Sequence, residues 1–134
     1  MTDYLIRLAW PSRALSPNAR VDRRSATPAR KAARTEGWAE AKRVGAQIAA
    51  DAHLEFTFYP PNRARRDLDN LFSSMKAHRD GIASAAGVDD ESWSFSIRWG
   101  EVVKDGAVLI HVHGDDAWQS IGGLARNMIQ GKIE

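Results

Sequence analysis

Four segments of the chain alternate hydrophobic and polar residues, and two longer segments carry hydrophobic residues at helical spacing. The alternating segments are residues 2–10, 53–59, 92–99 and 107–113. A period of two residues is typical of strands with one buried face. We therefore expect four strands.

The segments with helical spacing lie between these strands. The first is residues 27–50, in which Thr27 is placed to cap the helix and Pro28 occupies the first helical position. The second is residues 69–86, and it is followed by Gly87, a residue common at the C-terminal ends of helices. We therefore expect two main helices.

The resulting order is strand, helix, strand, helix, strand, strand, which predicts an α+β (mixed α/β) fold. We expect one domain over residues 1–134, in which two main helices pack on a mixed four-stranded sheet. Asp105-Gly106 predicts a hairpin between the last two strands. Residues 113–134 are a C-terminal extension, and residues 117–129 within it have the spacing of a short helix.

The composition is that of an ordinary globular protein, with 43% hydrophobic and 27% charged residues. The chain has no cysteine, which excludes disulfides and zinc sites built on thiolates. Its apolar runs are too short for a transmembrane helix, and its N-terminus lacks the apolar core of a signal peptide. We therefore expect a cytoplasmic protein with no membrane partner.

The net charge of +2 is unevenly divided along the chain. Residues 1–66 hold 13 Lys and Arg against 6 Asp and Glu, a balance of +7, and residues 67–134 hold 6 against 11, a balance of −5. A basic half attracts polyanions, because contacts with phosphates release condensed counterions. The pattern favours a nucleic-acid partner, and a solvated basic surface is the alternative.

Two acidic clusters follow the basic half. Asp67 and Asp69 stand at the entrance of the second predicted helix, and Asp89-Asp90 stands after its end. One acid at such an entrance can simply cap the helix, whereas several acids together match the oxygen ligands that Mg²⁺ prefers. A helix of about 17 residues is roughly 25 Å long. Asp90 can therefore join Asp67 only if the chain folds back or if the acids meet across a dimer.

The residues around these acids resemble the RusA family of Holliday junction resolvases. The resemblance is carried by Arg66-Asp67-Leu68-Asp69-Asn70-Leu71, Asp80-Gly81-Ile82 and Gly87-Val88-Asp89-Asp90. A weaker part is Leu8-Ala9-Trp10-Pro11 with Ser16-Pro17-Asn18. The similarity runs from about residue 4 to residue 113, and its most specific part is the acidic pattern.

The resemblance implies a homodimer that nicks two strands of a four-way DNA junction with Mg²⁺, for which Mn²⁺ can substitute. It implies that Asp67, Asp69 and Asp90 are metal ligands, with Asp89 as the alternative to Asp90. The same three acids and Lys76 are then the catalytic residues.

The sequence departs from the family pattern at one position. The family carries a lysine one turn after the Asp-Leu-Asp-Asn motif, where this chain has Ser73. Lys76 lies three residues later, on the predicted helical stripe that also holds Asp69 and Asp80. We expect Lys76 to stabilise charge on the scissile phosphate. The alternative is that this role is lost and catalysis is weaker.

Nine basic residues and one amide are the expected contacts with DNA. They are Arg13, Arg20, Arg23, Arg24, Arg30, Lys31, Arg63, Arg65, Arg66 and Asn70. Most are arginines, which suit bidentate contacts with phosphate. For the linker arginines just before Asp67, the alternative is a solvated loop.

The histidines carry a weaker signal. His111 and His113 share one face of the last predicted strand, a spacing that can bind a metal ion. Because no third ligand is apparent from the sequence, we interpret them as part of a solvated or partly covered face. His53 and His78 are isolated in the sequence. No glycine-rich phosphate loop is present, so we expect no nucleotide cofactor.

The leading interpretation is an Mg²⁺-dependent endodeoxyribonuclease that resolves Holliday junctions by paired nicks in DNA recombination and repair. A second interpretation, from a different class, is a non-catalytic protein that binds branched DNA. A third is an interaction protein whose acids only cap a helix.

Overall fold

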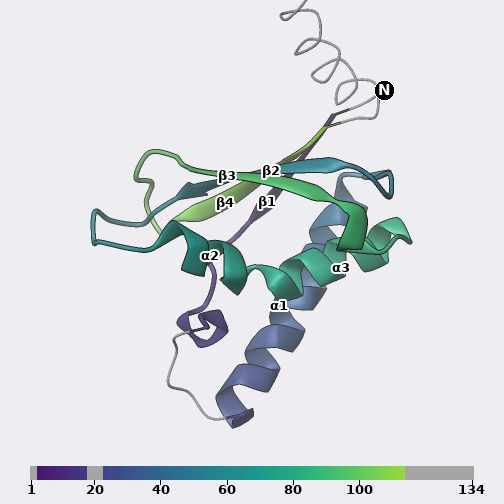
Figure 1. Cartoon of the computed structure of the whole chain (residues 1–134). Coiled ribbons are helices and arrows are strands. Elements are labelled where there is room, and N and C mark those ends of the chain that lie inside the picture. Colours follow the sequence, from purple (N-terminus) through teal and green to yellow (C-terminus); the bar gives the residue numbers. More distant parts are fainter. Residues whose placement is uncertain (1–2, 18–22, 114–134) are drawn as a thin grey trace, which may run out of the picture.

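In the computed structural model, which describes residues 3–17 and 23–113, the chain adopts the predicted α+β fold. A four-stranded mixed sheet carries three α-helices on one face (Figure 1). The predicted helix over residues 117–129 lies outside the described residues. No helix in the described part has the length and hydropathy needed to span a bilayer.

The sheet has the strand order β1-β4-β2-β3. Its strands are β1 (Tyr4–Leu8), β2 (His53–Tyr59), β3 (Ser94–Trp99) and β4 (Ala107–Val112). Strand β4 pairs antiparallel with both β1 and β2, and β2 pairs parallel with β3. The two-residue alternation correctly predicted which side chains face the core. In β1, for example, Ile6 and Leu8 are buried whereas Leu5 is 56% exposed.

The prediction that Asp105-Gly106 joins two paired strands in a hairpin is wrong. The turn itself forms, with both residues at positive φ (65° and 69°). The strand that follows it, however, inserts between β1 and β2 and does not pair with β3. Burial explains the difference. Strand β4 is almost wholly buried and takes a central position, while the more exposed β3 forms an edge.

Helix α1 spans Arg23–Arg43, so its predicted start at Thr27 and its predicted end near residue 50 are both wrong. Pro28 lies inside the helix and removes one backbone hydrogen bond near its start. The helix stops before Gly45, which adopts φ 66°, a left-handed conformation that glycine enters without steric cost.

The single helix predicted over residues 69–86 is broken into α2 (Leu68–Ser74) and α3 (Lys76–Ala86). The hydroxyl of Ser74 donates a hydrogen bond to the carbonyl of Asn70 at 2.9 Å, a local bond that bends helices. Met75, at the junction, leaves helical geometry and is fully buried. The break redirects α3, which then packs closely on α1.

Two glycines allow α1 and α3 to touch backbone to backbone. A Cβ atom on Gly81 would lie 2.0 Å from the carbonyl oxygen of Arg34, and one on Gly37 would lie 2.3 Å from that of His78. Only residues without a side chain fit at both positions. This close crossing brings Arg34 of α1 beside Asp80 of α3.

The core lies between the sheet and the helices. Its largest fully buried side chains are Ile6, Leu8, Leu54, Phe56, Phe58, Met75, His78, Ile82, Val108, Ile110 and Val112. The opposite face of the sheet, here called the outer face, is not covered by any of the three α-helices (Figure 1). Short 3₁₀ turns at Arg13–Leu15 (η1) and Asp90–Ser92 (η2) complete the described elements.

Candidate active site

Lys76, Asp80 and Asp90 form a charged cluster on the helical side of the molecule. The Nζ atom of Lys76 lies 2.8 Å from Oδ1 of Asp80 and 3.4 Å from Oδ2 of Asp90. The hydrogen bond to Asp80 raises the pKa of Lys76, and the charge and hydrogen bond of Asp90 act in the same direction against the effect of burial. One cation is therefore shared by two carboxylates.

Asp90 reaches this cluster because the chain folds back after α3. Gly87 adopts φ 72°, and the backbone amides of Gly87 and Val88 close the helix end on the carbonyls of Ser84 and Ala83. Turn η2 then runs back beside α3 and is in contact with it. The sequence left open whether the chain folds back or the acids meet across a dimer. The chain does fold back within the subunit, and this brings Asp90 to Lys76.

The structure separates the roles of the adjacent acids Asp89 and Asp90. Oδ1 of Asp89 accepts a hydrogen bond from the amide of Glu91 at 3.0 Å and caps η2. The carboxylate of Asp90 instead points to Lys76, and its side chain is only 15% exposed. The two neighbouring carboxylates therefore have different partners in the structure.

Asp67 is the N-cap residue of α2. Its Oδ1 accepts hydrogen bonds from the amides of Asp69 (2.9 Å) and Asn70 (3.4 Å). Asp69 is exposed in the first turn of α2, one helical turn before Ser73. The capping function considered from the sequence is therefore real for Asp67, while the carboxylate of Asp69 faces outward.

The three acids expected to bind Mg²⁺ are not gathered at one point. Within the part of the chain that the structure describes, one group of three potential ligands has all its donor atoms within 4.8 Å, and it is a different group, described below. The oxygens of Asp80 and Asp90 do converge on a single cation, the ammonium of Lys76. One or two carboxylates suffice for Mg²⁺ when water and phosphate complete its shell. The oxygen donors of this cluster thus suit a small hard cation.

Two adjoining hollows flank the cluster, with volumes of about 540 and 430 Å³. The larger is lined by Arg30, Lys31 and Arg34 of α1 and by Ser73, Lys76 and Asp80 across from them. The smaller is lined by Asp80, Asp89 and Asp90, again with Arg34. Arg34 and Asp80 therefore belong to both hollows, and a basic wall from α1 faces acids from α3 and η2.

The other residues predicted to contact DNA are spread more widely. Arg13, Arg24, Arg63 and Arg65 are exposed. Arg66 is held in place by Asn62, whose Oδ1 lies 2.7 Å from Nη2, and it packs over the ring of Trp10 at 5.4 Å. Arg20 and the side chain of Arg23 lie outside the described residues.

Arg79 is a residue that the sequence did not single out. Its guanidinium lies over the rings of Phe72 and Phe95, at 4.5 and 5.1 Å from their centroids. Burial lowers the pKa of Arg79, and the charges of Asp90 and Asp80 oppose this effect. A second cation therefore lies near Asp80 and Asp90. Helical periodicity alone does not distinguish this residue from an ordinary surface arginine.

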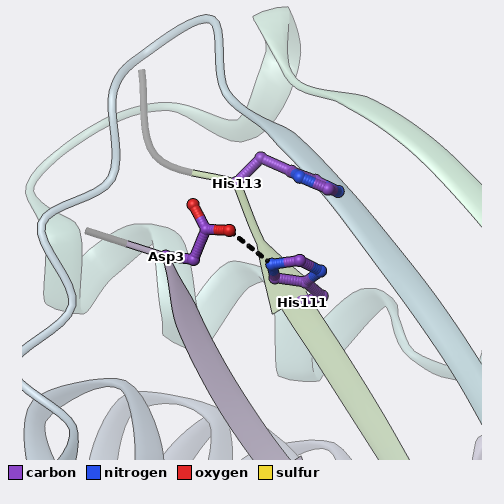
Figure 2. A group of neighbouring side chains, drawn as sticks. All are labelled: Asp3, His111 and His113. Atoms are coloured by element: carbon purple, nitrogen blue, oxygen red, sulfur yellow. Dashed lines mark hydrogen bonds and ion pairs between the residues drawn. The ribbon is translucent and has the colours of Figure 1, made fainter. Parts of the chain in front are cut away.

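A second polar cluster, on the outer face of the sheet, was also missed. Figure 2 shows Asp3 beside His111 and His113, and Oδ2 of Asp3 lies 2.9 Å from Nε2 of His111. Asp3 is thus a potential third ligand that was not apparent from the sequence. Asp3 is 108 residues from His111 along the chain, and only the pairing of β1 with β4 brings them together.

His53 and His78 are isolated in the sequence, but both have polar partners in the structure. The ring nitrogens of His53 lie 2.8 and 3.0 Å from the hydroxyls of Ser94 and Ser96. Nε2 of His78 lies 3.1 Å from Oε1 of Glu36, and Oε2 of Glu36 accepts a hydrogen bond from the amide of Ala9. The Glu36–His78 pair thus ties α1 to α3 beneath the basic wall.

Comparison with known proteins identifies a relative of similar length. A protein of Xylella fastidiosa strain Temecula1, described as an uncharacterized protein, is 40% identical to the chain over 126 residues. The match covers 88% of this chain and 81% of that protein. No protein-family model matches the chain.

Proposed function

We propose that this chain, which belongs to the same protein family as the Xylella fastidiosa protein, is an Mg²⁺-dependent endodeoxyribonuclease that resolves four-way DNA junctions as a homodimer. The observation that carries the proposal is the return of Asp90 to Lys76, beside the basic wall of Arg30, Lys31 and Arg34. Carboxylates, a lysine on a flexible side chain and basic residues suited to phosphate are thereby combined at one surface.

In this proposal, Asp67, Asp69 and Asp90 are the residues that would hold Mg²⁺, as the family resemblance implies. Because they are not gathered at one point in this structure, they would have to converge when the ion and DNA bind. Asp67 would contribute the oxygen that does not cap α2. A bound Mg²⁺ supplies positive charge that activates water and offsets charge on the phosphoryl oxygens. The carboxylate of Asp90 is mostly shielded from solvent, so its attraction for a cation is weakened less by water than that of an exposed acid.

Lys76 has a separate role. Its ammonium is now shared between Asp80 and Asp90. When Asp90 binds another cation, its hold on the ammonium weakens, and the flexible side chain can turn toward a phosphate in the larger hollow. There it offsets the negative charge that develops in the transition state. This is the role expected for Lys76 in place of the family lysine.

The basic wall positions the DNA strand. Arg30, Lys31 and Arg34 line one side of the larger hollow, and Ser73 and Lys76 line the other. Phosphates bound along α1 would place the neighbouring phosphodiester across from the acids. Paired nicks require two such sites related by a two-fold axis, which a symmetric dimer supplies.

A non-catalytic binder of branched DNA is the alternative, and one observation favours it. Lys76 is neutralised by two acids and Asp67 is committed to a cap, so the same groups can serve as a purely structural network. In that case the basic wall still binds DNA, but no bond is cut.

Incubation of a labelled four-way junction with and without Mg²⁺ separates these functions. Paired nicks that depend on metal are expected for the nuclease, and the Asp69→Asn variant should lose them while it still shifts the junction in a gel. Binding without cleavage by the native chain would favour the alternative. If the native chain neither binds nor cuts the junction, both proposals are rejected. Near-native cleavage by Asp69→Asn would remove Asp69 from the metal site.

A further inference from the structure

We propose that Asp3, His111 and His113 form a binding site for a transition-metal ion of the Zn²⁺ class on the outer face of the sheet. The site shares no residue with the Lys76 cluster, which lies on the helical side, and the inference does not depend on the proposed nuclease function. Two imidazoles and one carboxylate are ligands that Zn²⁺ accepts.

The sheet itself brings the three side chains together. His111 lies in β4 and His113 directly follows its end, on the same face of the sheet, and β1 runs antiparallel beside β4. The register pairs Tyr4 with Val112, so Asp3 comes level with His113 and diagonal to His111. Figure 2 shows the carboxylate of Asp3 directed at the ring of His111.

The donor atoms are close to the spacing that a metal needs. All three lie within 4.8 Å of one another, and Asp3 Oδ2 is 2.9 Å from His111 Nε2. Bonds of about 2.0 to 2.2 Å in a tetrahedral site place ligand atoms about 3.4 Å apart. Small side-chain rotations are enough to reach this spacing, and a metal would replace the proton now held between Asp3 and His111.

The surroundings shield part of the site from solvent. His113 is only 8% exposed, and the centroid of its ring lies 4.1 Å from that of His111 and 5.5 Å from that of His53. The site therefore combines one buried imidazole, one partly exposed imidazole and one exposed carboxylate. The exposed carboxylate leaves a side from which an ion can enter.

His53 lies next to the site and provides a matched control. Both of its ring nitrogens are within hydrogen-bond distance of serine hydroxyls on β3. Glu55, on the same strand, lies opposite His111 in the register and 3.8 Å from Arg98. Neither residue belongs to the three-ligand group, so the site can be tested against a change of the same residue type one strand away.

A bound ion would fasten the edge strand β1 to the central strand β4 near the two ends of the described chain. A metal that binds the folded chain and not the unfolded chain raises the unfolding temperature. The ion would thereby stabilise the pairing of β1 with β4. With three protein ligands, a fourth position would remain for water.

Calorimetric titration of the full chain, freed of any histidine tag, with Zn²⁺ tests the site. One equivalent should bind, and Asp3→Asn and His111→Gln should each weaken binding by at least about 10-fold, judging from the sensitivity of metal sites to lost contacts. His53→Gln should bind Zn²⁺ as the native chain does. Circular dichroism of each variant shows that it is folded.

Two outcomes would overturn the proposal. One is native affinity in folded His111→Gln and Asp3→Asn. The other is loss of Zn²⁺ binding in Asp90→Asn alone, which would assign the metal to the acid cluster. A second readout is the imidazole spectrum in nuclear magnetic resonance, which is simple because the chain has 4 histidines. Zn²⁺ should shift the signals of His111 and His113 and leave that of buried His78 in place.

Discussion

The ammonium of Lys76 lies 3.4 Å from the carboxylate of Asp90, although the two residues are 14 positions apart and a whole helix stands between them. The contact exists because η2 folds back along α3. It joins the acid expected to bind metal to the cation expected to act on phosphate. The predictions below follow from this contact and from the elements that hold it.

Asp90→Asn should reduce cleavage of a four-way junction by at least about 100-fold, comparable to the removal of one electrostatic contact in an active site. Binding should be kept or strengthened, because a negative charge near the DNA is removed. Asp89→Asn is the matched control, since Asn caps a turn as well as Asp does. Equal loss of cleavage in both variants would contradict the separate roles assigned to these neighbours.

Lys76→Met should also reduce cleavage, by about 10²- to 10³-fold, if its ammonium offsets charge on the transferred phosphate. Single-turnover rates at saturating protein separate this effect from weaker binding. Lys104→Met, which removes an exposed lysine near the start of β4, should cleave at the native rate. Native single-turnover rates in Lys76→Met would show that the role of the family lysine has been lost from this chain.

Gly81→Ala should lower the free energy of unfolding by about 1 to 3 kcal/mol, the usual effect of overpacking. The new Cβ would lie 2.0 Å from the backbone carbonyl of Arg34, which cannot rotate away as a side chain can. Chemical denaturation measures the change, and Ser84→Ala on an exposed position of α3 is the control. Unchanged stability in Gly81→Ala would mean that the helices do not cross this closely.

The sequence predicted well those features that depend on local periodicity. Alternation in β1 correctly separated buried from exposed side chains, because a strand needs only one apolar face to pack. In the more central β2, Thr57 on the other face is buried as well. The same approach failed for the end of α1 and for the break at Met75. The end of α1 depends on the left-handed conformation at Gly45, and the break depends on the hydroxyl of Ser74 and on the burial of Met75. None of these follows from helical spacing.

The candidate sites were predictable only in part, for a related reason. The acids near α2 and α3 were visible because their spacing matches a known pattern, but the contact of Asp90 with Lys76 depends on the path of η2. Asp3 and His111 are joined only by the pairing of the first strand with the last described strand. Which strands pair over a long range depends on the whole sheet, so the sequence of a single strand does not reveal it.

Stability should fall in acid through Glu36. Burial raises the pKa of Glu36, but hydrogen bonds from His78 and the amide of Ala9, together with the charge of His78, outweigh it and lower the pKa below the usual 4.5. A lowered pKa stabilises the fold above about pH 4.5, and this contribution is lost as the pH falls through the folded-state pKa.

Glu36→Gln tests this linkage. At pH 7 the variant should be less stable by about 1 kcal/mol, a reduced value for a charged hydrogen bond because the side chain of Glu36 is 32% exposed. Urea unfolding at several pH values should show the difference from the native chain shrinking below pH 4.5, the usual pKa of Glu36. Glu101→Gln, in an exposed loop, should show no such trend. A difference that grows in acid would reverse the sign of the assigned shift.

If the basic wall binds phosphates, its residues should contribute to the salt dependence of DNA binding. Replacement of Arg30 and Lys31 by alanine removes two cations that line the larger hollow. Each lost phosphate contact should reduce the slope of log K against log salt by about 0.9. Arg7→Ala, on the outer face of the sheet, should leave the slope unchanged because that face lies away from the hollow. If Arg7→Ala instead reduced the slope and the double variant did not, DNA would bind the outer face, and the acids near α3 would be too far from the phosphodiester backbone to cut it.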